Sequence, residues 1–241
     1  MRTLRFGVVV PAAVLAGLGL LLAAPAADDK KEEGSAKPPQ GAEVLFNGKD
    51  LDGWESLGHK PAEWKVEDGY MEVVPGKGNI MTEKKFGPDF QLHVDFWLPL
   101  MPDAKGQERA NSGVFLQGRY EIQVLDSYMN DTYEKGGVGA LYSILEPDHE
   151  AMKKAVKPPE QWQTYDITFH APRVDDQGTV KESGRVTVAL NGVTIIDDGK
   201  FDKYTPGEID TKLGEMGPLV LQDHGCKVRY RNIWLKPIEA K

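Results

Sequence analysis

NSGVFLQGRYEIQVLDS, residues 111–127, reads as two strands joined by a turn at Gly118-Arg119. One set of alternate positions is apolar, namely Val114, Leu116, Ile122 and Val124. The intervening set carries polar or aromatic groups, namely Phe115, Gln117, Glu121 and Gln123. Because successive side chains of a strand point to opposite faces, the pattern predicts a hairpin that buries one face and presents amides, an aromatic ring and a carboxylate on the other.

The same alternation recurs along the chain and predicts an all-β domain. Asp68-Gly69 and Asn191-Gly192 each separate two alternating runs, which indicates a β-hairpin turn at both places. Only residues 147–156 read as a helix, and that segment is short. Many short strands separated by turns predict a sandwich, a jelly roll or a barrel.

Bulk composition restricts the class of protein. The 241 residues, 40% hydrophobic and 27% charged, fit one large folded domain or two small ones. The net charge is -8 and no basic stripe is visible, so we expect no nucleic-acid partner. The acidic balance also argues against docking on anionic lipid. Cys226 is the single cysteine, so the core must stabilise the domain without disulfides.

The first 42 residues differ in composition from the rest. Residues 1–26 combine two early arginines, an apolar run and a closing Ala-Pro-Ala, which is typical of a secretory signal peptide. An uncleaved membrane anchor is the alternative. Residues 27–42 are charged and rich in proline and glycine, and they predict a disordered linker. We therefore expect a secreted or periplasmic protein that meets the membrane only through its signal segment, with one domain at residues 43–241.

Three predicted strands carry side chains suited to sugar recognition. Aromatic faces stack on the C–H side of a pyranose ring, while amides and carboxylates bind its hydroxyl groups. Each such residue alone is more often a solvated surface group or a core residue, so the combination carries the prediction. Beside the polar face of residues 111–124, the other two strands contribute His93, Asp95, Trp97, Gln222 and His224.

Other chemical motifs are weaker or absent. The sequence has no nucleophile elbow, no phosphate-binding glycine loop, no H-E-x-x-H and no cysteine cluster for zinc. Asp126, Asn130 and Asp131 in DSYMND offer oxygen atoms to a hard cation. We interpret that stretch as an acidic surface loop that binds nothing.

Five stretches occur in the order seen in a known family: LFNGKDLDGW, NSGVFLQGRYEIQVLDSY, WQTYDI, LNGV and LQDHGCKVRYRNIWLKP. Through them the chain resembles the 3-keto-disaccharide hydrolase family, once called domain of unknown function 1080, over residues 43–237. The resemblance implies a concanavalin A-like jelly-roll sandwich of two antiparallel sheets, similar to laminin G domains. It also implies a binding site on a concave sheet face.

The resemblance further implies cleavage of glycosides whose sugar is oxidised at C3. The ketone acidifies the C2 proton because the resulting carbanion is an enolate, and the group at C1 can then leave. Water adds to the unsaturated sugar, so the net outcome is hydrolysis. Such a site needs a base near C2, a donor or cation near the ketone oxygen, and an acid near the leaving oxygen.

The matched stretches assign roles to particular residues. Glu121 and His224 are the expected base and acid, in either order. On strand parity alone, His93 and Asp95 either complete the site or hold a divalent cation that polarises the ketone; the sequence names no certain cofactor. The expected carbohydrate-binding side chains are Gln123, Gln222, His93, Asp95, Trp97, Phe115 and Gln117.

Two other functions fit the same residues. A carbohydrate-binding module without catalysis would use the same face. A conventional glycoside hydrolase would need a second carboxylate within about 5–10 Å of Glu121, which Asp95 would supply. The sequence leaves the sugar, its linkage, the metal requirement and the oligomeric state open.

Overall fold

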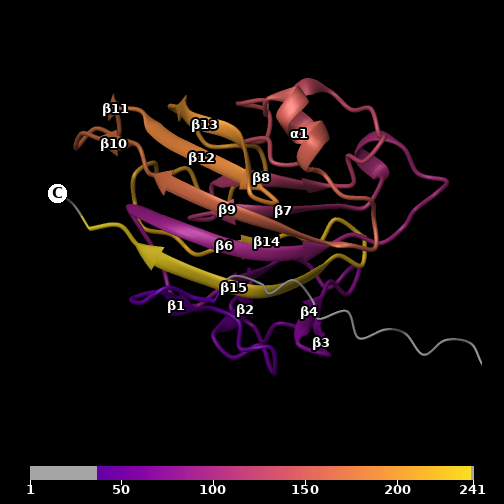
Figure 1. Cartoon of the computed structure of the whole chain (residues 1–241). Coiled ribbons are helices and arrows are strands. Elements are labelled where there is room, and N and C mark those ends of the chain that lie inside the picture. The colour runs from indigo at the N-terminus through magenta and orange to yellow at the C-terminus, as the bar shows by residue number, and fades with distance from the viewer. Residues whose placement is uncertain (1–36, 240–241) are drawn as a thin grey trace, which may run out of the picture. The chain divides into compact units, whose positions relative to one another are not determined.

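The computed structural model describes residues 37–239, which form a β-sandwich of two antiparallel sheets (Figure 1). This confirms the predicted all-β jelly-roll sandwich. The predicted signal peptide and residues 27–36 of the predicted linker lie outside the described residues. Residues 37–42 are mostly exposed, and the Ala42 N–H donates a hydrogen bond to the Pro39 carbonyl. No helix in residues 37–239 is long and apolar enough to cross a membrane.

The larger sheet has eight strands, and β15, β6, β9 and β12 run side by side across its middle (Figure 1). In spatial order the strands are β13 (Val193–Phe201), β12 (Gly184–Leu190), β9 (Trp162–His170), β6 (Asp89–Trp97), β15 (Arg229–Pro237), β4 (Tyr70–Glu72) and β3 (Lys65–Glu67), with β1 (Glu43–Val44) also paired to β15. The predicted hairpins are confirmed, since Asp68-Gly69 joins β3 to β4 and Asn191-Gly192 joins β12 to β13. All four turn residues have positive φ angles, as a two-residue type I′ hairpin turn requires.

The smaller sheet has five strands and contains the hairpin predicted from residues 111–127. Its order is β2 (Trp54–Ser56), β5 (Ile80–Thr82), β14 (Val220–Leu221), β7 (Asn111–Leu116) and β8 (Tyr120–Leu125). The predicted turn between β7 and β8 is present, with positive φ at Gln117 and Gly118. Glu121 lies opposite Phe115 across this hairpin.

Short elements fill the connections. The predicted helix is α1, which is capped by Asp148: its carboxylate accepts a hydrogen bond from the Ala151 N–H at 2.8 Å. Helix α1 packs against β13. The bounds of the remaining elements are η1 (Gly106–Glu108), η2 (Glu134–Gly136), α1 (His149–Ala155), β10 (Arg173–Val174) and β11 (Val180–Glu182).

One hydrophobic core lies between the two sheets. The alternate apolar positions of the β7–β8 hairpin are all fully buried in it: Val114, Leu116, Ile122 and Val124. From the larger sheet, Val94, Phe96 and Tyr165 meet them. Because these side chains take the inner faces, their polar neighbours on the same strands stand on the outer faces of the sandwich.

Candidate functional site

A cavity of about 240 Å³ lies on the outer face of the smaller sheet, and we call it the Glu121 cavity. It brings together four residues that the sequence predicted for one site: Glu121, Gln123, Gln222 and His224. Strands β7 and β8 supply its floor, and loops supply its rim. Its lining residues are Gln107, Asn111, Glu121, Gln123, Tyr142, Pro206, Gly207, Gln222 and His224.

Glu121 is the only carboxylate among these lining residues, and it is 3% exposed. Its backbone N–H donates to Thr205 Oγ1 at 2.9 Å, which fixes β8 beneath the 202–219 loop. Within the described residues its carboxyl group has no hydrogen-bond or ion-pair partner. Burial raises the pKa of Glu121 to about 8, because the charged form is poorly solvated there. The carboxyl group is therefore mostly protonated at neutral pH.

Three amide side chains present unused hydrogen-bond acceptors in the same cavity. Asn111 Oδ1, Gln123 Oε1 and Gln222 Oε1 are buried without a partner. The amide nitrogens of Asn111 and Gln123 are held by Gln107, donating to its backbone carbonyl at 2.8 Å and to Oε1 at 3.0 Å. A buried polar atom without a partner costs about 1–3 kcal/mol. The three oxygens are therefore ready to accept hydrogen bonds from a ligand rich in hydroxyl groups.

Tyrosines from the core fix the backbone that carries these amides. Tyr165 donates its hydroxyl hydrogen to the Gln123 carbonyl at 2.6 Å. Tyr230 donates to Ser112 Oγ at 2.7 Å, and Ser112 donates to the Gln222 carbonyl at 2.6 Å. Rigid support of this kind keeps binding groups in place before a ligand arrives.

His224 reaches the cavity from a loop. The expected strand ends earlier, since β14 stops at Leu221, although the Gln222 N–H still donates to the Gly113 carbonyl at 3.0 Å. Asp223 anchors the following loop, because its carboxylate accepts hydrogen bonds from the N–H groups of Gly76 and Gly78 at 2.8 and 2.9 Å. His224 is consequently exposed to solvent at the rim.

The structure corrects the expectation that His93, Asp95 and Trp97 share this site. All three lie on β6, in the middle of the larger sheet, and alternate with the core residues Val94 and Phe96. They therefore stand on the outer face opposite to the one that carries the Glu121 cavity. Neither an Asp95 carboxylate nor a cation held by His93 and Asp95 is placed to act on a sugar beside Glu121.

His93 instead belongs to a polar cluster on the larger sheet, in which His93 and Asp95 are buried and Asp166 is exposed. It contacts Asp166 at 2.7 Å and Asp95 at 3.4 Å, and its ring stacks on Trp234 with centroids 5.0 Å apart. Burial alone would lower the pKa of His93, but Asp166 and Asp95 outweigh it and raise the pKa to about 9. Trp97 is covered by the guanidinium of Arg229, 4.1 Å from its ring centre. These contacts show that His93, Asp95 and Trp97 have structural roles on the outer face of the larger sheet.

Phe115 and Gln117 stand on the predicted outer face of the smaller sheet, but neither lines the Glu121 cavity. Phe115 packs with Met81 and Val220 beneath the 202–219 loop. Gln117 turns toward the neighbouring loop, where its amide nitrogen donates to the Phe86 carbonyl at 3.1 Å. Contacts with these two loops therefore take both side chains away from a ligand.

The sequence did not predict several of the residues that line the Glu121 cavity. Asn111 has the same strand parity as Phe115 and Gln117, so the alternation itself could have identified it. Gln107, Tyr142, Pro206 and Gly207 lie outside the strands of the sheet, where no periodic signal marks a side chain that faces a cavity.

The side chains of the DSYMND loop form structural hydrogen bonds with neighbouring segments. Asp126 accepts a hydrogen bond from Arg109 Nε at 2.6 Å, and Asn130 exchanges hydrogen bonds with the backbone of Gly106 at 2.8 and 3.0 Å. Within residues 37–239 no three His, Cys, Asp or Glu side chains are grouped so that they could hold a metal ion.

The Glu121 cavity combines a buried carboxyl group, three open amide acceptors and an imidazole at its rim. The comparisons with known proteins place the chain among glycoside-acting proteins of hydrolase or lyase type. The chain belongs to the family of 3-keto-alpha-glucoside-1,2-lyase-like domains, whose model matches residues 41–236. The comparison with curated proteins found no match.

One solved structure supports this assignment, and a second supports the fold. A proposed glycosyl hydrolase from Parabacteroides distasonis ATCC 8503 is 40% identical, with 83% of this chain and 85% of that chain covered and a TM-score of 0.76. Another proposed glycosyl hydrolase from the same organism is 24% identical, with 83% and 94% covered and a TM-score of 0.58. The second likeness shows the fold alone.

Proposed function

We propose that this protein cleaves 3-keto-glycosides by removing the C2 proton, releasing the group at C1 and hydrating the unsaturated product. The observation that carries the proposal is the buried Glu121 carboxyl group, which lines one cavity with His224 and has no protein partner for its oxygens within the described residues. The match to the family of 3-keto-alpha-glucoside-1,2-lyase-like domains supports the same substrate class.

Glu121 and His224 suit complementary proton transfers. Because burial raises its pKa to about 8, Glu121 is protonated at neutral pH and suits the acid that donates to the leaving oxygen. His224 is exposed at the rim and suits the base that removes the C2 proton and passes it to water. The C2–H and C1–O bonds break, a C1=C2 double bond forms, and water then adds across it.

The amide acceptors explain how such a sugar would be held. Asn111, Gln123 and Gln222 each present a buried oxygen without a partner, and the remaining hydroxyl groups of a keto-sugar are donors of the matching kind. Each hydrogen bond from the sugar satisfies a buried acceptor that lacks a partner. The free energy of binding is therefore more favourable than for a hydrogen bond to an exposed amide.

A paired-carboxylate glycoside hydrolase finds less support. That mechanism needs a second carboxylate across the cleft from Glu121. Glu121 is the only carboxylate that lines the cavity, and Asp95 lies on the other sheet. A carbohydrate-binding module without catalysis remains the second candidate, because the open amide acceptors would serve binding equally well.

The test uses the full chain with 3-keto-trehalose and methyl 3-keto-glucoside, following sugar release in D₂O. We expect turnover, with deuterium at C2 of the released keto-sugar above the level in keto-sugar incubated alone. Glu121→Gln and His224→Gln should each lower kcat/KM by about 100-fold or more, the usual contribution of a proton-transfer group. Glu182→Gln on β11, which does not line the Glu121 cavity, is the matched control and should keep full activity.

The outcomes separate the candidates. Turnover without deuterium at C2 contradicts the elimination route and favours direct hydrolysis. Binding of an intact sugar by calorimetry, with no product from either keto-glycoside, favours the binding module. Full activity in Glu121→Gln removes Glu121 from the chemistry.

We also propose that the protein acts outside the cytoplasm, on the basis of the signal-like residues 1–26. N-terminal sequencing of the protein from the periplasmic or culture fraction should give a chain that starts near residue 27. Retention of the intact N-terminus in a membrane fraction would instead support the anchor alternative.

A further inference from the structure

Tyr142 is the cross-strand neighbour of Glu121 on the outer face of the smaller sheet. The segment that contains Tyr142 runs antiparallel beside the edge strand β8, with Leu141 bridged to Ile122. Both bridged side chains are fully buried in the core, so Tyr142 and Glu121 take the opposite face, and both line the Glu121 cavity. The Tyr142 N–H donates to the Glu121 carbonyl at 3.0 Å. The β-carbons of such neighbours lie about 4.5–5.5 Å apart.

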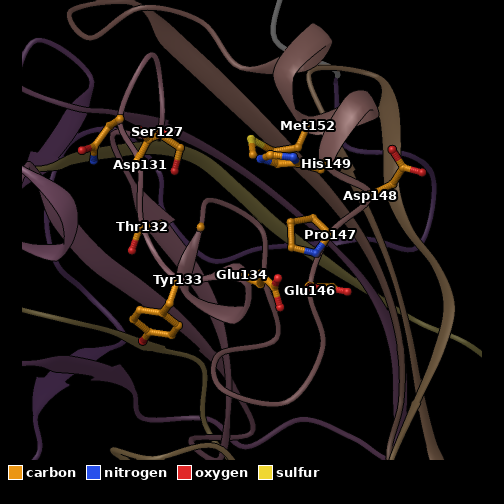
Figure 2. Close-up of a pocket in the computed structure, with 12 residues that line it drawn as sticks. Ser127, Asp131, Thr132, Tyr133, Glu134, Glu146, Pro147, Asp148, His149 and Met152 are labelled. Atoms are coloured by element: carbon orange, nitrogen blue, oxygen red, sulfur yellow. The ribbon is translucent and has the colours of Figure 1, made fainter.

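Tyr133 contacts Tyr142 and orients its hydroxyl group. The two rings meet at 65° with centroids 6.0 Å apart. Tyr133 lines a groove of about 760 Å³ and lies at the end of that groove away from His149 (Figure 2). Burial raises the pKa of Tyr133 above its ordinary value, and a hydrogen bond with Tyr142 adds to the rise. A hydrogen bond that raises the pKa of a phenol keeps the proton on it, so Tyr133 donates and the hydroxyl hydrogen of Tyr142 is left for another acceptor.

The proposed reaction develops negative charge on the ketone oxygen. Removal of the C2 proton turns the 3-keto group into an enolate, whose charge rests largely on the oxygen at C3. A donor already aimed at that oxygen lowers the barrier, because it needs no reorganisation when the charge appears. In the proposed reaction Glu121 protonates the leaving oxygen and His224 removes the C2 proton. The donor to the ketone oxygen is therefore a third group.

The amide nitrogens beside Glu121 are already engaged. Asn111 donates from Nδ2 to the backbone carbonyl and the side-chain oxygen of Gln107 at 2.8 and 3.4 Å. Gln107 in turn donates from Nε2 to Thr132 Oγ1 at 2.6 Å and to the Gly136 carbonyl at 2.7 Å. Gln123 donates from Nε2 to Gln107 Oε1 at 3.0 Å. The open atoms of Asn111 and Gln123 are their oxygens, which cannot stabilise an enolate.

Tyr142 and Gln222 are the remaining neutral side-chain donors in the cavity lining. A phenol is a much stronger acid than an amide, and O–H groups form the shortest hydrogen bonds to anions, at about 2.5–2.7 Å. Tyr142 also stands beside Glu121, whereas Gln222 follows β14, two strands away from β8. The ketone and the leaving oxygen belong to one sugar ring, at C3 and C1, so donors on two adjacent segments suit them.

We propose that Tyr142 donates a hydrogen bond to the ketone oxygen of the substrate and stabilises the enolate formed when the C2 proton leaves. This inference rests on the proposed function and adds a catalytic residue to it. The C2–H bond breaks, and its electron pair enters the enolate, whose oxygen is held by the Tyr142 O–H. The pair then forms the C1=C2 double bond as the group at C1 leaves with the proton of Glu121. Tyr142 keeps its own proton throughout.

The experiment separates proton removal at C2 from release of the group at C1. The full chain is incubated in D₂O with 3-keto-1,5-anhydroglucitol, which carries hydrogen at C1 in place of the glycosidic oxygen, and NMR follows deuterium uptake at C2 above that of the analogue alone. Tyr142→Phe should lower this exchange and kcat/KM for methyl 3-keto-glucoside by about 100- to 1,000-fold each, the usual contribution of one such donor. Glu121→Gln should lower cleavage but keep the exchange.

Two further variants exclude a merely structural effect. Tyr70→Phe is the matched control, because Tyr70 is a half-buried tyrosine on β4 of the larger sheet whose hydroxyl donates to Glu67 at 2.9 Å. It should keep both rates. Replacing Tyr142 by 3,5-difluorotyrosine keeps the shape of the side chain but makes the phenol more acidic. The exchange rate should then fall at a lower pH than in the wild type, because the donor loses its proton sooner.

The outcomes distinguish this inference from the function beneath it. Exchange at the wild-type rate in Tyr142→Phe overturns the inference and leaves the cleavage reaction standing. If Gln222→Met or treatment with EDTA abolishes the exchange while Tyr142→Phe keeps it, the ketone oxygen belongs to Gln222 or to a cation. If the wild type exchanges the C2 proton but cleaves no keto-glycoside, the proposed function fails and the exchange rates still decide the role of Tyr142. If the wild type does neither, both fail.

Discussion

The carboxyl group of Glu121 lies over the backbone of Gly113, across the hairpin on β7. A β-carbon on residue 113 would overlap the Glu121 carboxyl group, so this space exists only because residue 113 has no side chain. Residue 113 pairs with Gln123 in the ladder, which makes Glu121 its diagonal neighbour. The position of the proposed acid therefore depends on a residue that has no functional group of its own.

We expect Gly113→Ala to displace the Glu121 carboxyl group and lower kcat/KM. A displacement of about 1 Å at a reacting group can cost about 100-fold. Steady-state kinetics on a 3-keto-glycoside would measure the loss. Gly58→Ala is the control, since a methyl group there meets only Ser56 Oγ at 3.9 Å. Equal activity in both variants would show that the carboxyl group tolerates the shift.

The activity should depend on the protonation of Glu121. Its pKa is raised to about 8 by burial, and the proposed acid must carry a proton. The pH profile of kcat/KM should therefore fall as pH rises through about 8, because the active protonated form disappears. A profile that rises through the same range would make Glu121 the base and His224 the acid.

Stability should respond to the same carboxyl group. Between about pH 4.5 and 8 the folded chain holds a proton on Glu121 that the unfolded chain has released, so its contribution to the free energy of unfolding falls as pH rises. At about 1.4 kcal/mol per pKa unit, Glu121→Gln should gain a few kcal/mol over wild type between pH 4.5 and 8. Urea titrations at several pH values test this. A constant difference would mean that the carboxyl group is better solvated than its burial indicates.

Replacing an unpartnered amide should separate binding from stability. Gln222→Met keeps the shape of the side chain but removes the buried oxygen that lacks a partner. We expect KM to rise about 3- to 10-fold while the free energy of unfolding stays equal or increases by about 1 kcal/mol. Gln117→Met is the comparison, since Gln117 Oε1 is also unpartnered but lies away from the cavity. A raised KM in both variants would indicate a general effect on the sheet.

The polar cluster on the larger sheet should matter for stability and not for catalysis. Asp166 and Asp95 outweigh burial and raise the pKa of His93 to about 9, so its stabilising contribution is complete below about pH 6.5 and is lost as pH rises through about 9. His93→Gln should cost about 3 kcal/mol at pH 6 and less at pH 9, with kcat unchanged. The half-exposed His170→Gln is the control. A large loss of kcat in His93→Gln would restore His93 to the site.

The sandwich could be predicted from the sequence because burying one face of a strand makes apolar residues recur at every second position. Val114 and Ile122 face the core, and Glu121 and Gln123 face away, as side-chain alternation requires. Alternation assigns a residue to one face of its own sheet but does not say which sheet that is. His93 and Glu121 have the same parity on their strands and yet stand on opposite sides of the molecule, because strand pairing across the chain decided between the sheets.

Site residues in loops were harder to predict from the sequence than site residues in strands. Tyr142 reaches the cavity from a loop and Gln107 from the short helix η1, and the paths of both segments depend on contacts far along the chain. Strand alternation and the family motif both selected His224, although its segment is a loop where a strand was expected.

On the β7–β8 hairpin, one set of alternate side chains packs into the core, and the other set faces outward to the side that carries the Glu121 cavity. Two neighbouring positions on β8 can therefore evolve under unrelated constraints, one governed by volume and the other by chemistry. A relative can therefore change the cavity-facing side chains at residues 111, 121 and 123 without repacking the core behind the hairpin. A systematic mutational scan of residues 111–124 should accordingly show two interleaved profiles, one of lost solubility and one of lost turnover.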